Sequence, residues 1–139
     1  MDKFKEIRPI SLGLVISGNR LLLSEGYDKV KDEYFYRPIG GGIDFQETSE
    51  QALIREFEEE IGANIKVIEK LDVVDNIFVF DGMPAHEIIF LFRVEFPEEQ
   101  ILEEYHIHED SGDSIARWIE KSDIISGRIK VYPEIKRYI

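Results

Sequence analysis

One segment, residues 40–63 with the sequence GGGIDFQETSEQALIREFEEEIGA, constrains the fold more than any other part of this chain. Thr48 is a suitable helix N-cap, and Gln51 three positions later fits a capping box. Apolar residues recur at i, i+4 and i+8 and predict a helix with one buried stripe, made of Leu53, Phe57 and Ile61. Gly62 suits the left-handed position that ends many helices. The segment therefore predicts glycines, a short loop and an amphipathic helix.

The C-terminal half of this helix is crowded with acidic residues, namely Glu56, Glu58, Glu59 and Glu60. The helix dipole favours cations at that end, and like charges at i, i+4 repel each other. Glu56, Glu59 and Glu60 share a face by helix angle. Arg55 lies off that face and can pair with Glu59 at i+4 and with Glu47 from the preceding loop. A bound hard cation would remove the remaining repulsion, because Mg²⁺ takes oxygen ligands of this kind.

The glycines that precede the helix support the same interpretation. Without Cβ atoms, they let the backbone approach a ligand or a metal closely. Each half of the segment also has an ordinary structural explanation, namely a tight turn and a solvated, glutamate-rich helix. The combination of the two halves is what makes the pattern specific.

The segment resembles the Nudix box of the Nudix hydrolase (MutT-like) family. That pattern is Gly, five residues, Glu, seven residues, then Arg-Glu-hydrophobic-x-Glu-Glu-x-Gly-hydrophobic. Every fixed position matches, at Gly41, Glu47, Arg55, Glu56, Glu59, Glu60 and Gly62. Four positions depart from common family usage: Ile39 separates Pro38 from the glycines, Gln46 replaces a frequent glycine, and Phe57 and Ala63 fill positions that are usually aliphatic. These departures bear on the substrate class and leave the expected metal ligands intact.

The resemblance implies hydrolysis of a pyrophosphate bond in a nucleoside diphosphate linked to another group, with Mg²⁺ or Mn²⁺ as the cofactor. Glu56 and Glu60 are the implied main metal ligands, and Glu59 is a further ligand or the general base. The Gly40 carbonyl is another implied ligand. Arg55 and Glu47 are implied to orient the helix carboxylates. The implied catalytic set is therefore Glu59, Glu60 and Arg55.

Other candidate site residues lie outside the acidic helix. The Gly41 backbone and Arg37 are expected to contact the substrate, with a surface ion pair as the alternative for Arg37. An acidic residue from the loop before SIARWIE often joins the metal site in this family, and the candidates here are Glu109, Asp110 and Asp113. A nucleobase could stack on an aromatic residue of the YFY run, Tyr34, Phe35 or Tyr36, although such strand residues more often belong to a core. The histidines, His86, His106 and His108, are possible metal ligands, and Trp118 is expected to serve packing.

The composition narrows the function classes. The chain has 139 residues, which suits one Nudix domain over 1–139, and a formal net charge of −12. Such a charge disfavours a nucleic-acid polymer or an anionic membrane as a partner, whereas a small nucleotide can bind through divalent metal. Cysteine is absent, no apolar run reaches the length of a membrane span, and the first residues, MDKFKEIRPI, lack the apolar core typical of a signal peptide. We therefore expect a cytoplasmic protein, with a homodimer as a possible assembly.

The order of strands and helices expected in the rest of the chain predicts an α/β fold. It is compatible with the Nudix-type α/β/α sandwich with a mixed β-sheet. Strands are expected over residues 7–17, 20–25, 34–39, 64–74, 76–80, 86–96 and 114–120. An irregularity is expected around Asp75-Asn76, between the fourth and fifth of these strands. Residues 26–33 and 97–113 are expected to be loops, 121–127 a short helical turn and 131–139 a closing helix. The run IIFLF indicates a strand covered on both faces.

Two alternatives to an active enzyme are a Nudix-fold nucleotide-binding module that has lost catalysis and a structural Ca²⁺-binding protein. The intact Arg-Glu step and Glu-Glu pair disfavour the first, and the absence of an EF-hand loop pattern disfavours the second. The ADP-ribose and coenzyme A branches are disfavoured because their accompanying signatures are not evident. Modified nucleoside triphosphates and other nucleoside diphosphate derivatives stay open as substrates.

Overall fold

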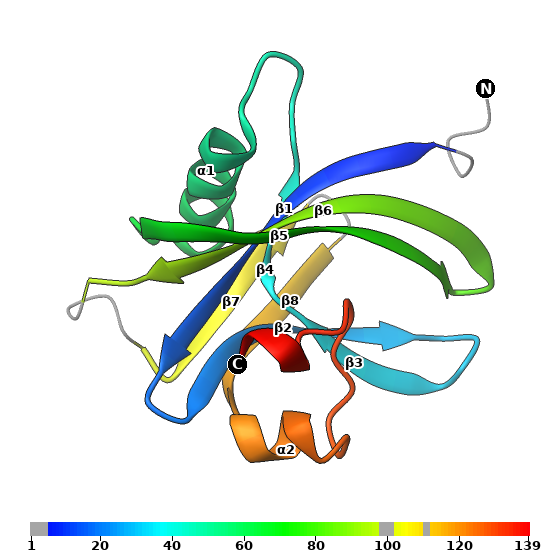
Figure 1. Ribbon diagram of the computed structural model, residues 1–139. Helices are drawn as coiled ribbons and strands as arrows, with labels where there is room; N and C mark the ends of the chain where they lie inside the picture. The colour runs from blue at the N-terminus through cyan, green and yellow to red at the C-terminus, as the bar shows by residue number, and fades with distance from the viewer. Residues whose placement is uncertain (1–5, 98–101, 110–111) are drawn as a thin grey trace.

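The computed structural model describes residues 6–97, 102–109 and 112–139 (Figure 1). The elements are, in chain order, β1 (Ile7–Ser17), β2 (Arg20–Asp28), β3 (Glu33–Arg37), β4 (Ile39–Gly42), α1 (Ser49–Ile61), β5 (Lys66–Phe80), β6 (Met83–Glu95), β7 (Glu104–Glu109), β8 (Gly112–Glu120), α2 (Lys121–Ile125) and the 3₁₀ turn η3 (Lys136–Tyr138).

The strands form one mixed sheet with the order β5-β6-β1-β2-β8-β7, with β3 paired to β2 and β4 paired to β1. β1 and β6 run parallel over nine residue pairs, from Ile7 opposite His86 to Val15 opposite Val94. The other pairings are antiparallel. β1 and β2 pair only next to their shared turn, at Ile16 and Ser17, so the two halves of the sheet diverge beyond it. The predicted mixed sheet is confirmed.

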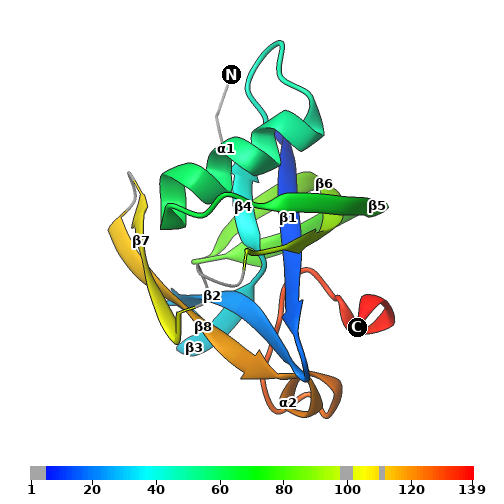
Figure 2. The same cartoon turned by 90° about the vertical axis from the view of Figure 1, so that its left-hand side faces the viewer.

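Helical segments cover two different faces of this sheet, as Figures 1 and 2 show. On one face, Leu53 and Phe57 of α1 pack with residues of β1, β6, β7 and β8 in one buried cluster. On the other face, Ile124 of α2 and the later residues Val131 and Ile135 pack in a second cluster. β6 contributes Leu91 to the second cluster and Phe92 to the first, so its apolar run faces two cores. This is the predicted sandwich, although its second helical layer is thin.

The central helix forms as the sequence predicts. Thr48 accepts a hydrogen bond from the Gln51 N–H, and the Gln51 side chain accepts one from the Thr48 N–H. Gly62 ends the helix at φ 67°. The capping box fixes where the helix starts, and Phe57, which is fully buried, fixes which side faces the core. The direction of the acidic residues follows from these two constraints.

Several expected boundaries are wrong. Residues 104–109 form β7 instead of a loop, because Tyr105 and Ile107 alternate into the core under α1. The closing helix over 131–139 is reduced to the turn Lys136–Tyr138. Pro133 disfavours a helical residue before it, and Val131 bridges to Tyr36 of β3.

The hairpins also differ from expectation. β2 continues to Asp28 and β3 begins at Glu33, so the expected loop over 26–33 is shorter. β5 is continuous through Asp75-Asn76, and its register shifts lie earlier, between Val67 and Glu69 and between Lys70 and Asp72. These pairings extend the β2–β3 and β5–β6 hairpins toward each other at the right of Figure 1.

Candidate active site

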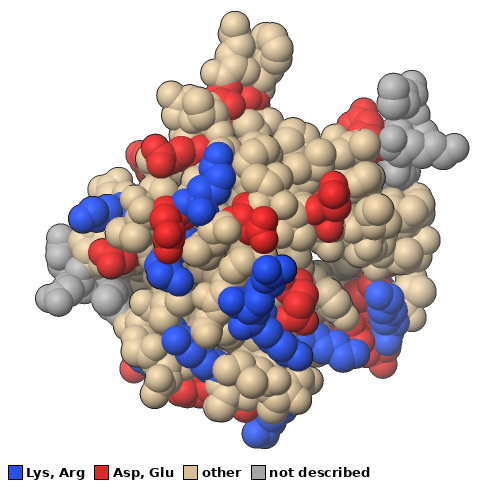
Figure 3. Space-filling view, in the orientation of Figure 1, with Lys and Arg blue, Asp and Glu red and all other residues tan. Residues whose placement is uncertain are grey.

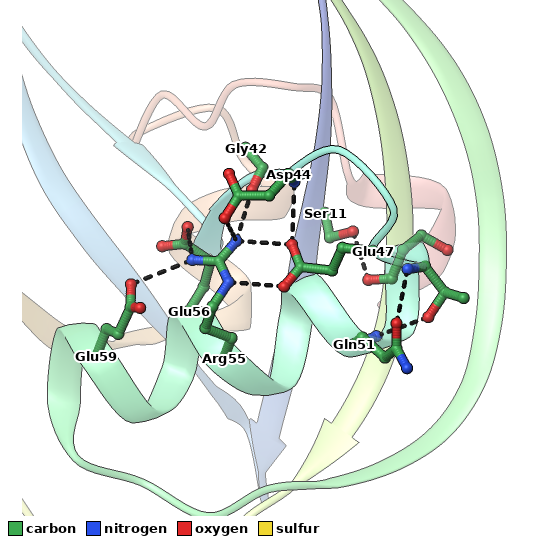
Figure 4. A network of polar contacts seen from close by, with 10 residues as sticks. Ser11, Gly42, Asp44, Glu47, Gln51, Arg55, Glu56 and Glu59 are labelled. Carbon is green, nitrogen blue, oxygen red and sulfur yellow. Dashed lines mark hydrogen bonds and ion pairs between the residues drawn. The ribbon is translucent and has the colours of Figure 1, made fainter.

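Arg55 is the centre of the polar network at the start of α1 (Figure 4). Its Nε and one Nη donate to the two carboxylate oxygens of Glu47, at 2.7 and 2.8 Å. The same Nη donates to the Gly42 carbonyl at 3.0 Å, and the other Nη donates to Glu56 at 2.9 Å and to Glu59 at 3.1 Å. The guanidinium therefore joins the loop before the helix to two helix carboxylates. The sequence-based pairs of Arg55 with Glu47 and Glu59 are confirmed.

The ionisation of this network follows from its contacts. The hydrogen bonds from Arg55, followed by the one from the Asp44 N–H, lower the pKa of Glu47 to about 2. The hydrogen bond to Glu47 contributes most to raising the pKa of the Arg55 guanidinium, so Arg55 stays charged at any ordinary pH. The bidentate pair is therefore a permanently charged anchor for the loop.

Glu56 lies directly against the glycine strand. A Cβ on Gly41 would lie 2.6 Å from the Glu56 carboxyl carbon, so any larger residue there would displace the Glu56 carboxylate from its present position. The Glu56 side chain is 15% exposed, and burial raises its pKa while Arg55 opposes that rise. A half-buried carboxylate held against bare backbone is suited to an additional cation, because the single Nη contact leaves acceptor positions unused.

The other two acidic residues of the expected face have different environments. The Glu59 side chain is 59% exposed, whereas Glu60 is buried at 9% exposure. In the described residues, no three His, Asp or Glu side chains are arranged to hold a metal ion. The expected unpaired carboxylate face is corrected in part, since Arg55 already pairs with Glu56 and Glu59. The metal assignment of Glu56, Glu59, Glu60 and the Gly40 carbonyl stays a prediction.

The residues at this position nevertheless fit a hard divalent cation. Carboxylates are the ligands such ions prefer, and the glycines leave open backbone beside Glu56. Gly40 adopts φ 154°, and a Cβ there would lie 1.9 Å from the Ser11 carbonyl oxygen. The strand thus has no room for a side chain at Gly40, where the backbone of β1 lies close, and the Glu56 carboxylate occupies the space beside Gly41.

A cavity of about 860 Å³ lies between the β2–β3 and β5–β6 hairpins. Both hairpins extend to the right of Figure 1, and Figure 3 shows the molecule hollowed on the same side. Its walls are largely apolar, with Phe35, Phe78 and Phe80 among them, and its polar lining includes Arg8, Arg37, Asn76 and Glu87. No residue of the 40–63 segment lines it. The cavity approaches that segment at Arg8, whose Nη lies 3.8 Å from the position of a Cβ on Gly42.

Arg37 lines this cavity and donates a hydrogen bond to Glu87 at 3.0 Å. Glu87 is only 6% exposed, so the ion pair expected as an alternative exists but is not a surface pair. Sequence reasoning missed Glu87. Its position in the strand could have revealed it. Glu87 lies two residues before Ile89 and four before Leu91, so its carboxylate is on the same buried face of the strand as these apolar residues.

The remaining candidates are spread over the fold. Asp113 is exposed on β8, Asp110 lies outside the described residues, and Glu109 ends β7 without a described side chain. His86 lines the cavity, with its Nε2 3.9 Å from Asp75. Trp118 donates from Nε1 to the Leu102 carbonyl and packs beside the α1 cluster, which fits the predicted packing role.

Comparison with known proteins agrees with this geometry. A family model described as the NUDIX domain matches residues 7–139. The structure is similar to that of a NUDIX hydrolase from Nitrosomonas europaea, with a TM-score of 0.68, 16% identity, and coverage of 95% of this chain and 85% of that one. The chain belongs to the Nudix family, and it is a Nudix-type hydrolase.

Two further solved structures share the fold. An ADP-ribose pyrophosphatase from Streptococcus suis matches with a TM-score of 0.60 and 11% identity, over 91% of this chain and 81% of that one. A UDP-X diphosphatase matches with a TM-score of 0.60 and 15% identity, over 84% of this chain and 52% of that one. At these identities the likeness concerns the fold alone. None of the helices in the described part of the chain is long and apolar enough to cross a membrane.

Proposed function

We propose that this protein hydrolyses a pyrophosphate bond in a nucleoside triphosphate or another nucleoside diphosphate derivative, using Mg²⁺ or Mn²⁺. The observation that carries the proposal is the placement of Glu56 against Gly41, with Arg55 bonded to Glu56, Glu59 and Glu47. The intact Nudix box supplies this arrangement at every fixed position.

Within this proposal, Glu56 and Glu60 hold the metal, with the Gly40 carbonyl as a further ligand and Glu59 as a ligand or the general base. A bound divalent metal neutralises charge on the phosphate oxygens and lowers the pKa of water. Arg55 and Glu47 keep the helix carboxylates in orientation, and Arg37 and the Gly41 backbone contact the substrate. Water attacks a phosphorus of the pyrophosphate and gives its proton to the general base, and the P–O bond breaks so that pyrophosphate or the phosphorylated second group leaves from the nucleoside monophosphate.

The test is a screen of nucleoside triphosphates, nucleotide sugars and dinucleoside polyphosphates with Mg²⁺, with Mn²⁺ and with excess chelator, in which the products are identified. We expect a nucleoside monophosphate as one product, only with metal. Nucleotide binding without any turnover would instead support the catalytically weak binding module. A single working domain, a cytoplasmic location and a homodimer also stay predictions.

A further inference from the structure

The floor of the cavity is a row of polar side chains across three strands. Asn76 of β5 lies opposite Glu87 of β6, and Glu87 lies opposite Arg8 of β1. The row nearer the core is apolar, with Val74 opposite Ile89. Glu87 is thus a buried carboxylate, 6% exposed, at the border between a hydrophobic core and a cavity.

The carboxylate of Glu87 is only partly used by the protein. Its Oε1 accepts from the Arg37 guanidinium at 3.0 Å and, at the long distance of 3.5 Å, from the Asn76 amide. Within residues 6–97, 102–109 and 112–139, no hydrogen bond reaches its Oε2. Since Glu87 lines the cavity, this carboxylate oxygen is available to accept a hydrogen bond from a donor on a ligand bound there.

An aromatic wall stands beside this polar row. Phe35 of β3 contacts Phe80 edge-on at 5.6 Å between ring centroids, and Tyr132 at 6.1 Å. A Cβ on Gly26, its cross-strand partner, would lie 2.5 Å from the Phe35 ring, so the ring rests directly on the glycine backbone. Three contacts from separate segments fix the ring before any ligand binds, which suits it for stacking.

At the far end of the cavity, two hydrogen bonds join the tips of the β2–β3 and β5–β6 hairpins. The Asp81 N–H donates to Asp28 at 3.2 Å, and the Lys29 N–H donates to Asp81 at 2.7 Å. On the side of the acidic helix, the cavity-lining Arg8 lies next to Gly42, whose carbonyl accepts a hydrogen bond from Arg55. A ligand with its ring in the cavity can therefore extend its phosphates toward β4.

We propose that this cavity binds the base of the substrate and that Glu87 selects guanine. The inference rests on the proposed function and names its substrate class. The guanine edge carries a carbonyl followed by two N–H donors, at N1 and the 2-amino group. Glu87 accepts both donors, while Asn76, released from its long contact, donates to the carbonyl. Phe35 stacks on the ring.

Other bases fit this polar row less well. Adenine places a lone pair at N1 against the carboxylate, and uracil and cytosine each offer fewer adjacent donors. A well-placed bidentate pair discriminates between bases by roughly tenfold to a hundredfold. The competing role for Glu87 is to orient Arg37 toward a phosphate, in which case the identity of the base would not matter.

The first experiment measures binding of guanosine, inosine and adenosine 5′-monophosphates to the metal-free protein by calorimetry. We expect guanosine monophosphate to bind tightest, adenosine monophosphate roughly tenfold to a hundredfold more weakly, and inosine monophosphate in between, because it lacks only the 2-amino group. Equal affinity for the three would overturn the inference. This comparison needs no variant and no turnover.

The second experiment uses variants. Glu87→Gln should abolish the preference for guanine, whereas Phe35→Leu should weaken all three nucleotides alike, by roughly tenfold or more. Glu95→Gln, on the exposed end of the same strand, is the matched control and should bind as wild type. A uniform loss in Glu87→Gln would assign the residue to Arg37 alone and overturn the inference.

The outcomes separate the two proposals. Selective guanosine monophosphate binding without hydrolysis of any nucleotide would retain the base assignment and contradict the proposed reaction. Metal-dependent hydrolysis with no preference among bases would support the proposed reaction and overturn the guanine assignment.

Discussion

At the scale of single residues, Arg55 decides whether the helix carboxylates keep their orientation. Arg55→Lys retains the charge but loses the fork that holds both oxygens of Glu47. We expect activity or metal affinity to fall by ~10–100-fold, the usual effect of losing such an orienting partner. The measurement is steady-state hydrolysis against Mg²⁺ concentration for wild type, Arg55→Lys and Arg55→Ala.

Arg128→Lys serves as the control, because Arg128 is exposed and makes one long contact to Asp123. If Arg55 were only a surface ion pair, its loss would cost ~0–1 kcal/mol of stability and leave turnover unchanged. A wild-type metal titration in Arg55→Ala would therefore contradict the orienting role.

Because Arg55 lowers the pKa of the Glu47 carboxyl, the stability contributed by Glu47 should depend on pH. The pKa of the Glu47 carboxyl is about 2 in the folded protein, compared with 4.5 for an ordinary glutamate carboxyl. A lowered folded pKa means that the contribution to stability is fully present above about pH 4.5 and is lost as the pH falls toward 2. The free energy of unfolding should therefore differ between wild type and Glu47→Gln at neutral pH, and the difference should shrink between pH 4.5 and 2. A difference that does not change over this range, measured by urea unfolding, would refute the assignment.

At the scale of elements, β4 makes room for Glu56. Gly41→Ala would press a methyl group onto the Glu56 carboxylate, whereas at Gly42 the nearest atom to an added Cβ is 3.8 Å away. Both residues lie outside the positive-φ region. We expect Gly41→Ala to retain the fold but to need a much higher Mg²⁺ concentration for hydrolysis. Gly42→Ala should behave close to wild type. Equal effects of the two substitutions would show that space beside Glu56 is not the constraint.

The elements also show what the sequence reveals and what it hides. Helix α1 is predictable because its cap, its apolar stripe and its final glycine are all local signals. β7 is not, because its two buried residues, Tyr105 and Ile107, stand among acidic residues that favour a loop. The C-terminal segment carries a helical pattern, but its contacts with β3 and the core override it.

At the scale of the whole molecule, the candidate site has two halves with different origins. The Arg55 network is contiguous in sequence, so its spacing alone predicts most of its contacts. The cavity joins Arg37 to Glu87, fifty positions apart, and this pairing depends on how the two hairpins face each other. No local sequence pattern predicts that Arg37 and Glu87 come into contact. The alternation of Glu87 with buried apolar residues of its strand does predict that its side chain is buried.

The central claim is that α1 carboxylates hold a divalent metal for hydrolysis. The most direct measurement is the turnover of a substrate identified by the screen, against Mg²⁺ concentration, for wild type, Glu56→Gln, Glu60→Gln and the control Glu58→Gln, with melting curves alongside. Glu58 is exposed on the same helix, so the control makes the same chemical change away from Gly41. We expect Glu56→Gln and Glu60→Gln to lose turnover by orders of magnitude while staying folded, with Glu58→Gln unaffected. Full activity in both variants, or of the wild-type protein in excess chelator, would contradict the account.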